Sequence, residues 1–306
     1  MPIHLPPTTR RGFLNVLAAG GAALAWPGAR SAVAAGREED AADYVALLAD
    51  THIKSDPDMV VREKFHLSGN LRAAVADILA QPRPPAAALV LGDLALKNGR
   101  AEDYRQFLTL VEPLRERGIP VHLTLGNHDD RRNFLESFAA LGAAVGPVED
   151  RCVGVVEAAG VRLAMLDTLD QVDQVPGLLG DSQRAWLTKT LDEAPDAPTL
   201  VLFHHHLDDV PGALTDAKPL LEILRPRKQV KALVFGHTHT WRRAEDDGLH
   251  LVNLPAVAYH FNDPQPLGWC RLEPHRDGQG ATLELRCVDG DRSKHGERIE
   301  LAWRGA

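Results

Sequence analysis

The sequence is poor in cysteine, in aromatic residues and in positive charge. Three cysteines in 306 residues exclude a small domain held together by several disulfides, and 5% aromatic residues leave a core of mainly aliphatic side chains. A formal net charge of −8 argues against a general nucleic-acid-binding protein and against a duplex as partner. The chain also lacks the Gly-x-Ser-x-Gly motif of serine hydrolases and the phosphate-binding loop of nucleotide hydrolases, so neither class is supported.

The one long apolar segment lies near the N-terminus and predicts an export signal. Arg10-Arg11 precedes a Gly- and Ala-rich stretch over residues 13–26, and Ala32-Val33-Ala34 supplies the small residues of a cleavage site. The arginine pair resembles a twin-arginine signal. The stretch is shorter than the roughly 20 residues of a spanning helix, which disfavours the alternative of a retained anchor. We therefore expect removal of residues 1–34, a periplasmic or secreted protein without a stable membrane span, and a single domain over residues 35–306.

Short apolar runs alternate with helical patterns along the rest of the chain. The runs are continuous, as in strands that are buried on both faces. The spacing of Tyr104, Phe107, Val111 and Leu114 predicts a helix that ends at Gly118. This alternation predicts an α/β protein, and hairpin patterns from residue 249 to 303 predict antiparallel strands at the C-terminal end.

Two of the cysteines flank a turn signal at Asp277-Gly278-Gln279-Gly280. A two-residue loop at Gly278-Gln279 would place Cys270 directly opposite Cys287, which makes a cross-strand disulfide one interpretation. The alternative is two half-buried thiols. Cys152 has no local partner, so the odd number of cysteines leaves at least one thiol free.

Polar residues follow directly after several of the apolar runs. The carboxyl ends of strands in an open α/β sheet gather at one edge, where ligands bind. Carboxylate, amide and imidazole groups together suit transition metals such as Fe, Mn or Zn, and the lack of cysteine among them excludes a cysteine-type structural zinc site. The set is larger than one ion needs and predicts two divalent or mixed-valent ions. Its members are Asp50, His52, Asp93, Asn127, His128, Asp129, His204, His205, His206, His237 and His239.

The order of these motifs resembles that of the calcineurin-like metallophosphoesterases. Asp-x-His, Gly-Asp, Gly-Asn-His-Asp, a later histidine after a strand, and Gly-His-x-His occur in this order over residues 44–260. The Asp-Asp-Arg-Arg stretch at residues 129–132 and Leu166-Asp167-Thr168 are similar to the branch that contains class III cyclic-nucleotide phosphodiesterases and glycerophosphodiesterases. The resemblance implies a four-layer αββα sandwich, in which two mixed β-sheets are flanked by helices.

The resemblance also implies a role for each matching residue. His204 is chosen over His205 as a ligand because it comes first after its apolar run. The implied ligands are Asp50, His52 and His239 at the first ion, Asn127, His204 and His237 at the second, and Asp93 between the two.

The expected reaction starts from a hydroxide that bridges the two ions, and the leaving oxygen then needs a proton. The resemblance places His128 beside the leaving group, so His128 and the bridging Asp93 are the expected catalytic residues. Asp50 and Asp129 remain alternatives for orienting the His128 imidazole. Arg131, His205 and His260 are candidate substrate contacts; a solvated helix start is the alternative for Arg131, and loop structure is the alternative for His205.

These observations predict an exported hydrolase that acts on a small anionic phosphodiester, such as a cyclic nucleotide or a glycerophosphodiester. A phosphomonoesterase that uses the same site is the alternative. A non-catalytic metal-binding scaffold is disfavoured, because every position that the resemblance requires is filled. The sequence leaves the metal identity, the physiological ester and the oligomeric state open.

Overall fold

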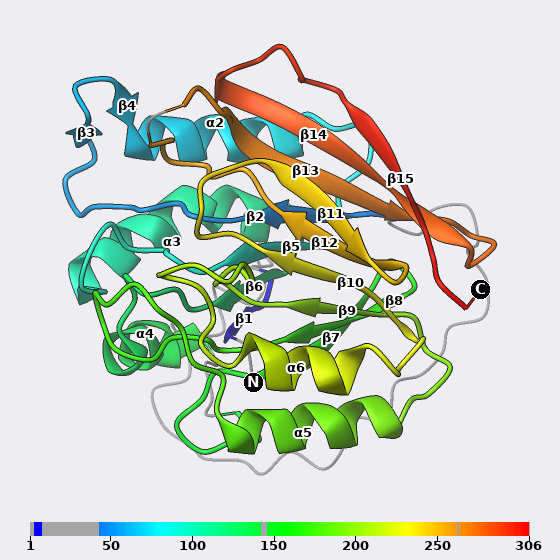
Figure 1. Ribbon diagram of the computed structural model, residues 1–306. Coiled ribbons are helices and arrows are strands. Elements are labelled where there is room, and N and C mark those ends of the chain that lie inside the picture. Colours follow the sequence, from blue (N-terminus) through cyan, green and yellow to red (C-terminus); the bar gives the residue numbers. More distant parts are fainter. Residues whose placement is uncertain (1–2, 8–42, 142–145, 262, 306) are drawn as a thin grey trace, which may run out of the picture.

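The computed structural model describes residues 3–7, 43–141, 146–261 and 263–305. Within these ranges the strands form two large mixed sheets and one short hairpin (Figure 1). The arginine pair and the expected cleavage site at Ala34 lie outside the described residues. No helix of the described ranges is long and apolar enough to cross a membrane.

The first sheet combines strands from both ends of the chain. Its central strands are parallel, and its C-terminal strands are antiparallel. Over the described residues it has seven strands, in the order β1 (Ile3–Leu5), β6 (Val121–Thr124), β5 (Ala87–Leu91), β2 (Val45–Leu48), β13 (Pro266–Pro274), β14 (Gly280–Gly290) and β15 (Arg298–Ala302).

The second sheet comes from the middle of the chain. Strands β8, β9, β10 and β12 run parallel, and antiparallel strands close both edges. Over the described residues its order is β11 (Arg242–Asp246), β12 (Leu249–Asn253), β10 (Val230–Phe235), β9 (Thr199–Leu202), β8 (Val161–Met165) and β7 (Gly154–Ala158). The short hairpin is formed by β3 (Val60–Val61) and β4 (Phe65–His66).

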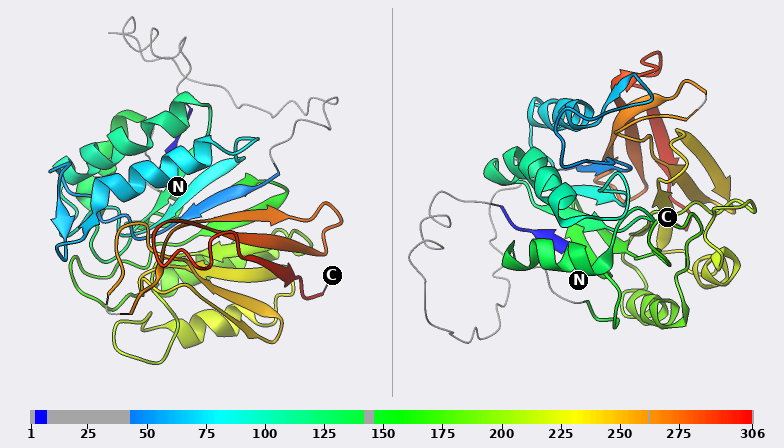
Figure 2. Two further views of the ribbon diagram at one scale, coloured as in Figure 1. Left: turned by 90° about the horizontal axis from the view of Figure 1, so that it is seen from above. Right: turned by 90° about the vertical axis from the view of Figure 1, so that its left-hand side faces the viewer.

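Helices cover the outer face of each sheet, and the two sheets face each other (Figure 2). One core cluster joins the first sheet to α2 (Leu67–Leu79), α3 (Ala101–Glu116) and α4 (Arg131–Phe138), which continues into η1 (Ala139–Leu141). A second cluster lies between the sheets, and a third joins the second sheet to α5 (Asp181–Asp192) and α6 (Ala217–Leu224). This αββα arrangement confirms the fold class expected from the sequence.

Strand β5 shows why the apolar runs are continuous. Ala88 and Val90 pack in the core on the helical side, whereas Ala87, Leu89 and Leu91 pack in the core between the sheets. Every residue of the strand is therefore buried. Burying a large aliphatic side chain such as leucine contributes roughly 1.5–3 kcal/mol, so central strands of this kind hold the sandwich together.

Strand β1 is the unexpected element of the first sheet, because it lies within residues 1–34. It pairs antiparallel with β6 and forms an edge of the sheet. Ile3 and Leu5 are fully buried, and the His4 ring stacks on the His122 ring with centroids 4.6 Å apart. In the structure the beginning of the chain therefore packs against the folded domain.

The C-terminal hairpin has a different register from the one expected. Cys270 faces Leu285 and Cys287 faces Gly268, because the turn is centred one residue earlier than the expected Gly278-Gln279 loop. The prediction that the two cysteines face each other directly is therefore wrong. Both are buried free thiols, as is Cys152.

Candidate metal centre

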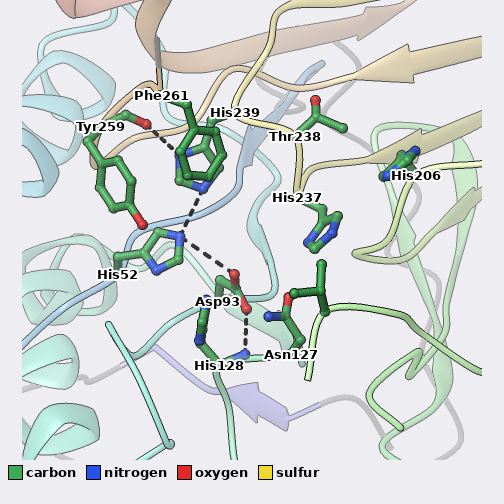
Figure 3. Close-up of a pocket in the computed structure, with 11 residues that line it drawn as sticks. His52, Asp93, Asn127, His128, His206, His237, Thr238, His239, Tyr259 and Phe261 are labelled. Atoms are coloured by element: carbon green, nitrogen blue, oxygen red, sulfur yellow. Dashed lines mark hydrogen bonds and ion pairs between the residues drawn. The ribbon is translucent and has the colours of Figure 1, made fainter. Parts of the chain in front are cut away.

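The candidate ligands come from the carboxyl ends of strands in both sheets. In the first sheet, Asp50 and His52 follow β2, Asp93 follows β5, and Asn127 follows β6. In the second sheet, His204 follows β9, and His237 and His239 follow β10. Because the two sheets end at the same side of the sandwich, these side chains converge on one site. Asp50 and His204 are fully buried, and the other five line the pocket drawn in Figure 3.

The first group of donors consists of Asp50, His52 and His239, whose ligand atoms lie within 4.8 Å of one another. The Nε2 atoms of His52 and His239 are 3.0 Å apart, and His239 Nε2 is 3.5 Å from Asp50 Oδ1. Backbone N–H of His237 donates to both carboxylate oxygens of Asp50, at 3.1 and 3.0 Å, which holds that carboxylate in place.

The second group consists of Asp93, His204 and His237. His237 Nδ1 lies 3.2 Å from His204 Nε2. Asp93 Oδ2 connects this group to the first, because it lies 3.4 Å from His204 Nε2 and 3.5 Å from His52 Nε2. Its other oxygen accepts a hydrogen bond of 2.9 Å from the His128 backbone N–H. Asp93 therefore occupies the position that a bridging carboxylate requires.

Hydrogen bonds around the histidines direct their lone pairs into the pocket. Nδ1 of His204 donates to the Leu91 carbonyl at 2.9 Å, and Nδ1 of His239 donates to the Tyr259 carbonyl at 2.6 Å. These bonds leave the Nε2 atom of each ring as the coordinating atom, as in other metal sites where a carbonyl fixes the ring. Asn127 Oδ1 is buried without a hydrogen-bond partner in the structure, so it is an unused acceptor beside the second group.

Burial keeps three of the four histidine ligands neutral. It lowers the pKa of His52 to about 4 and that of His237 to about 3, and it holds the pKa of His239 well below its usual value. Burial opposes the charge on His204 as well, but the adjacent Asp93 carboxylate outweighs it and raises the His204 pKa to about 9, so this ring has to release a proton when an ion binds. Imidazoles, carboxylates and a free amide oxygen make a donor set that fits transition-metal ions.

Several of these donors lie on strained backbone. Asp50, His52, Asp93, His237 and His239 all have positive φ angles, between 45° and 72°. Such left-handed conformations cost about 1–3 kcal/mol each for non-glycine residues, so the surrounding fold has to hold these five donors in place.

Glycine allows the strand ends to approach closely at this edge. A Cβ atom on Gly126 would lie 2.2 Å from Asp93 Oδ1, and a Cβ atom on Gly236 would lie 2.4 Å from Asp50 Oδ2. Only glycine leaves room for these carboxylates to enter the site.

His128 lies at the rim of the pocket with a partner that sequence reasoning missed. Its Nδ1 is 3.0 Å from Asp173 Oδ1, and backbone N–H of Asp173 donates to the Asn127 carbonyl at 2.7 Å. Neither expected partner contacts the His128 ring. Asp50 belongs to the first donor group, and the buried Asp129 accepts from Tyr104 Oη and from three backbone N–H groups. Asp173 lies in a long loop after β8, where the sequence pattern carried no signal for it.

The expected substrate contacts do not line this pocket. Arg131 makes a two-point ion pair with the fully buried Asp167, at 2.7 and 3.1 Å. His205 is fully buried and lies 2.8 Å from Thr168 Oγ1, and His260 packs edge-on against Phe65. Contact of Arg131, His205 and His260 with a substrate therefore stays a prediction that the pocket lining does not support. Lining residues that the sequence did not single out are Val175, Thr238, Tyr259 and Phe261.

Comparison with known proteins agrees with this geometry. The profile described as calcineurin-like phosphoesterase matches residues 44–241. The chain belongs to this family. It is therefore a metal-dependent phosphoric ester hydrolase by family, and the resemblance found in the sequence is confirmed.

Members of the calcineurin-like family similar to this chain include named phosphodiesterases. The 3′,5′-cyclic adenosine monophosphate phosphodiesterase CpdA of Haemophilus influenzae is 28% identical over 244 residues, covering 73% of this chain and 85% of that protein. The glycerophosphodiester phosphodiesterase GpdQ of Enterobacter lignolyticus is 27% identical over 236 residues, covering 72% and 81%.

Solved structures that are similar to this chain share its fold at low sequence identity. A dimetal phosphatase from Danio rerio has a TM-score of 0.66 and 16% identity, covering 86% of this chain and 100% of that chain. GAP50, the anchor in the inner membrane complex of Plasmodium, has a TM-score of 0.54 and 13% identity, covering 85% and 89%. The fold therefore occurs in proteins with different described roles, and function has to be argued from the site.

Proposed function

We propose that this chain is a dinuclear metal-dependent phosphodiesterase. The observation that carries the proposal is the position of Asp93 Oδ2, which lies within 3.5 Å of a histidine from each donor group. One carboxylate oxygen between two groups of imidazoles and carboxylates suits a pair of ions about 3.5–4 Å apart. The first ion would be held by Asp50, His52 and His239, and the second by Asn127, His204 and His237. Fe, Mn and Zn all match these donors.

When bound, the ion pair would neutralise the phosphate charge and lower the pKa of a water molecule that attacks phosphorus. The protein itself holds the donors at fixed positions. Asp50 is fixed by the His237 backbone and Asp93 by the His128 backbone, so neither carboxylate has to reorganise when the site is loaded. Such preorganisation is a major part of electrostatic catalysis.

His128 is placed to protonate the leaving oxygen. It lies in the pocket wall but in neither of the proposed ligand sets, and its ring is about one quarter exposed. With Nδ1 directed at Asp173, its Nε2 is free to carry a proton toward the substrate. An alkoxide leaving group needs such a proton, which typically contributes about 10²–10⁴-fold to the rate.

The two named relatives favour a diester as substrate. CpdA is described as a cyclic adenosine monophosphate phosphodiesterase and GpdQ as a glycerophosphodiester phosphodiesterase, and the chain covers more than four fifths of each. The alternative is a phosphomonoesterase, which the dimetal phosphatase with the same fold keeps open.

The test is a comparison of two chromogenic esters on metal-loaded protein. Bis-4-nitrophenyl phosphate should be hydrolysed with a higher kcat/KM than 4-nitrophenyl phosphate, and a chelator should abolish both activities. His128→Ala should lower kcat by about 10²–10⁴-fold while two ions per chain remain bound. Preference for the monoester would reject the diesterase, and fewer than two ions per chain would reject the dinuclear site.

Export of the protein by its N-terminal segment is part of the proposal. The Arg10-Arg11 pair, the apolar stretch over residues 13–26 and the small residues before position 35 support it. Replacing both arginines by lysine should leave the uncleaved chain inside the cell, as fractionation would detect. Processing that is unaffected by this change would contradict a twin-arginine route.

A further inference from the structure

We infer that Arg62, Tyr259 and Phe261 form a subsite for a planar aromatic ring in one ester group of the substrate, such as a nucleobase. These three residues are called the aromatic wall below. The inference rests on the proposed phosphodiesterase function, and it selects nucleotide-like esters over esters of small polyols such as glycerol.

The aromatic wall begins directly at the metal ligands. The Phe261 ring stacks on the His239 ring with centroids 4.4 Å apart and an angle of 27° between the planes. Tyr259 packs against His52 and His239, with centroid distances of 5.0 and 4.6 Å. Figure 3 shows both aromatic side chains beside these histidines, so a ring attached to a bound phosphate would reach the wall directly.

Phe261 is exposed to an unusual degree for a phenylalanine. Its relative exposure is 45%, and it lines a cavity of about 360 Å³. An exposed aromatic ring at the mouth of a concave site is typical of a surface that binds a ligand. Stacking on such a ring tolerates different bases, because every base has a π-face.

Arg62 adds a cation to the same surface. Its guanidinium lies 5.2 Å from the Phe261 ring centroid and 5.7 Å from the Tyr259 centroid, and Nη1 donates to the Phe261 carbonyl at 3.3 Å. No carboxylate of the described ranges lies within ion-pair distance of Arg62. The charge is therefore available for a cation–π or hydrogen-bonding contact with a planar ring.

The opposite side of the pocket has different chemistry. There the exposed Val175 also lines a second cavity of about 990 Å³, whose lining in the described residues includes Asp208, Asp209 and Val210 and no aromatic side chain. That lining combines aliphatic side chains with charges of both signs, because Lys218 and Arg225 accompany the two aspartates. The His206 ring also lines the metal pocket but is stacked on His237, so we place the aromatic ring of the substrate at the aromatic wall and the other ester group toward Val175.

The experiment compares two phosphates that differ only in the base. Adenosine 5′-monophosphate and ribose 5-phosphate are titrated into manganese-loaded protein by calorimetry, with chromatography to verify that both remain intact. Wild type should bind the adenosine compound about 5- to 100-fold more tightly, because stacking of one base has that effect on affinity. Phe261→Leu should remove most of this preference and leave the affinity for ribose 5-phosphate unchanged.

Two further variants make the result specific. Arg62→Asn should also reduce the preference for the adenosine compound. Asparagine is chosen because it tolerates the positive φ of 52° at this position. Val60→Ala removes an equally exposed apolar side chain that lines neither cavity and should change nothing. Equal binding of the two phosphates by wild type, or a preference that survives in Phe261→Leu, would overturn the aromatic wall. The titration measures binding and not turnover. Its result therefore tests the aromatic wall even if the diester assay shows no phosphodiesterase activity.

Discussion

At the scale of single residues, Asp173 is the contact that gives His128 a defined orientation. Its carboxylate fixes Nδ1 of the ring, and the Lys97 ammonium lies 3.4 Å from its other oxygen. A histidine held in this way presents one tautomer to the substrate, as in other acid–base pairs in which a carboxylate orients the imidazole. Asp173 acts through His128, so it is a positioning residue.

Asp173→Asn should therefore slow the reaction without emptying the metal site. We expect kcat to fall by about 10²-fold, the lower end of a general acid's contribution, with KM and metal content nearly unchanged. Because Asp173 acts through His128, the double variant with His128→Ala should be no slower than His128→Ala alone. Asp170→Asn, an exposed residue in the same loop, is the matched control. A further loss of kcat in the double variant would refute the positioning role.

Arg131 should affect stability instead of catalysis. Its guanidinium neutralises Asp167, which is fully buried and also accepts from the Cys152 and Leu169 backbone N–H groups. Arg131→Ala leaves that carboxylate unpaired and should lower the free energy of unfolding by about 3 kcal/mol. Urea unfolding would measure this change. The control Arg132→Ala, at an exposed position, should have a free energy of unfolding within about 0.5 kcal/mol of the wild-type value. A raised KM with unchanged stability would restore Arg131 as a phosphate contact.

At the scale of elements, the ends of the strands could be predicted far better than the loops. Asp50, Asp93 and Asn127 each follow a continuous apolar run, which is typical of a central strand. The carboxyl ends of neighbouring parallel strands lie at one edge of the sheet, so the sequence predicts that these residues meet there. Asp173 and Phe261 lie outside such runs, and their positions depend on how long loops fold over the rim. The disagreement at Cys270 has a related origin, because the turn is centred one residue earlier than expected and Cys270 pairs with Leu285 instead of Cys287.

Gly126→Ala tests the packing of these strand ends. The new methyl group would overlap the Asp93 carboxylate and its backbone nitrogen, so Asp93 would move away from its position between the donor groups. We expect metal affinity to fall by about 10- to 100-fold, as when a group that supports a ligand is lost. Gly118→Ala, where a Cβ atom meets nothing within 4 Å but the φ of +87° strains any side chain, should lose some stability and still bind metal normally. If Gly126→Ala and Gly118→Ala bind equal amounts of metal when the metal is substoichiometric, Gly126 is not needed to position Asp93.

At the scale of the whole molecule, β1 joins the start of the chain to the folded sandwich. Its backbone pairs with β6, and the Pro6 carbonyl accepts from Arg115 Nε at 3.1 Å. Removal of residues 1–34, as expected on export, would take this strand away and leave β6 as an open edge. The precursor and the processed chain would then differ in structure as well as in length.

The docking of β1 should weaken in acid. Burial lowers the pKa of His122 to about 3 and also lowers that of His4. A histidine whose pKa is lower in the folded state stabilises fully above its unfolded value near 6.5, and that contribution is lost as the pH falls from 6.5 toward 3. Hydrogen exchange at the Leu123 amide should therefore accelerate between pH 7 and pH 5 beyond its intrinsic pH dependence.

His122→Leu should remove most of this acid sensitivity, because the residue no longer gains a proton. His66→Leu, on the short hairpin away from β1, is the control and should keep the wild-type dependence. An identical acid response in wild type and His122→Leu would show that the stacked histidines have no influence on the strand.

Left-handed backbone lowers thermal stability at five positions whose side chains the activity needs. These positions are Asp50, His52, Asp93, His237 and His239. A glycine at any of them would relieve the backbone strain and at the same time remove a metal ligand. Selection for thermostability alone would therefore favour variants that have lost part of the metal site. Screens that score only melting temperature should therefore recover inactive variants at this edge, whereas screens that also require turnover should find their stabilising changes elsewhere in the sandwich.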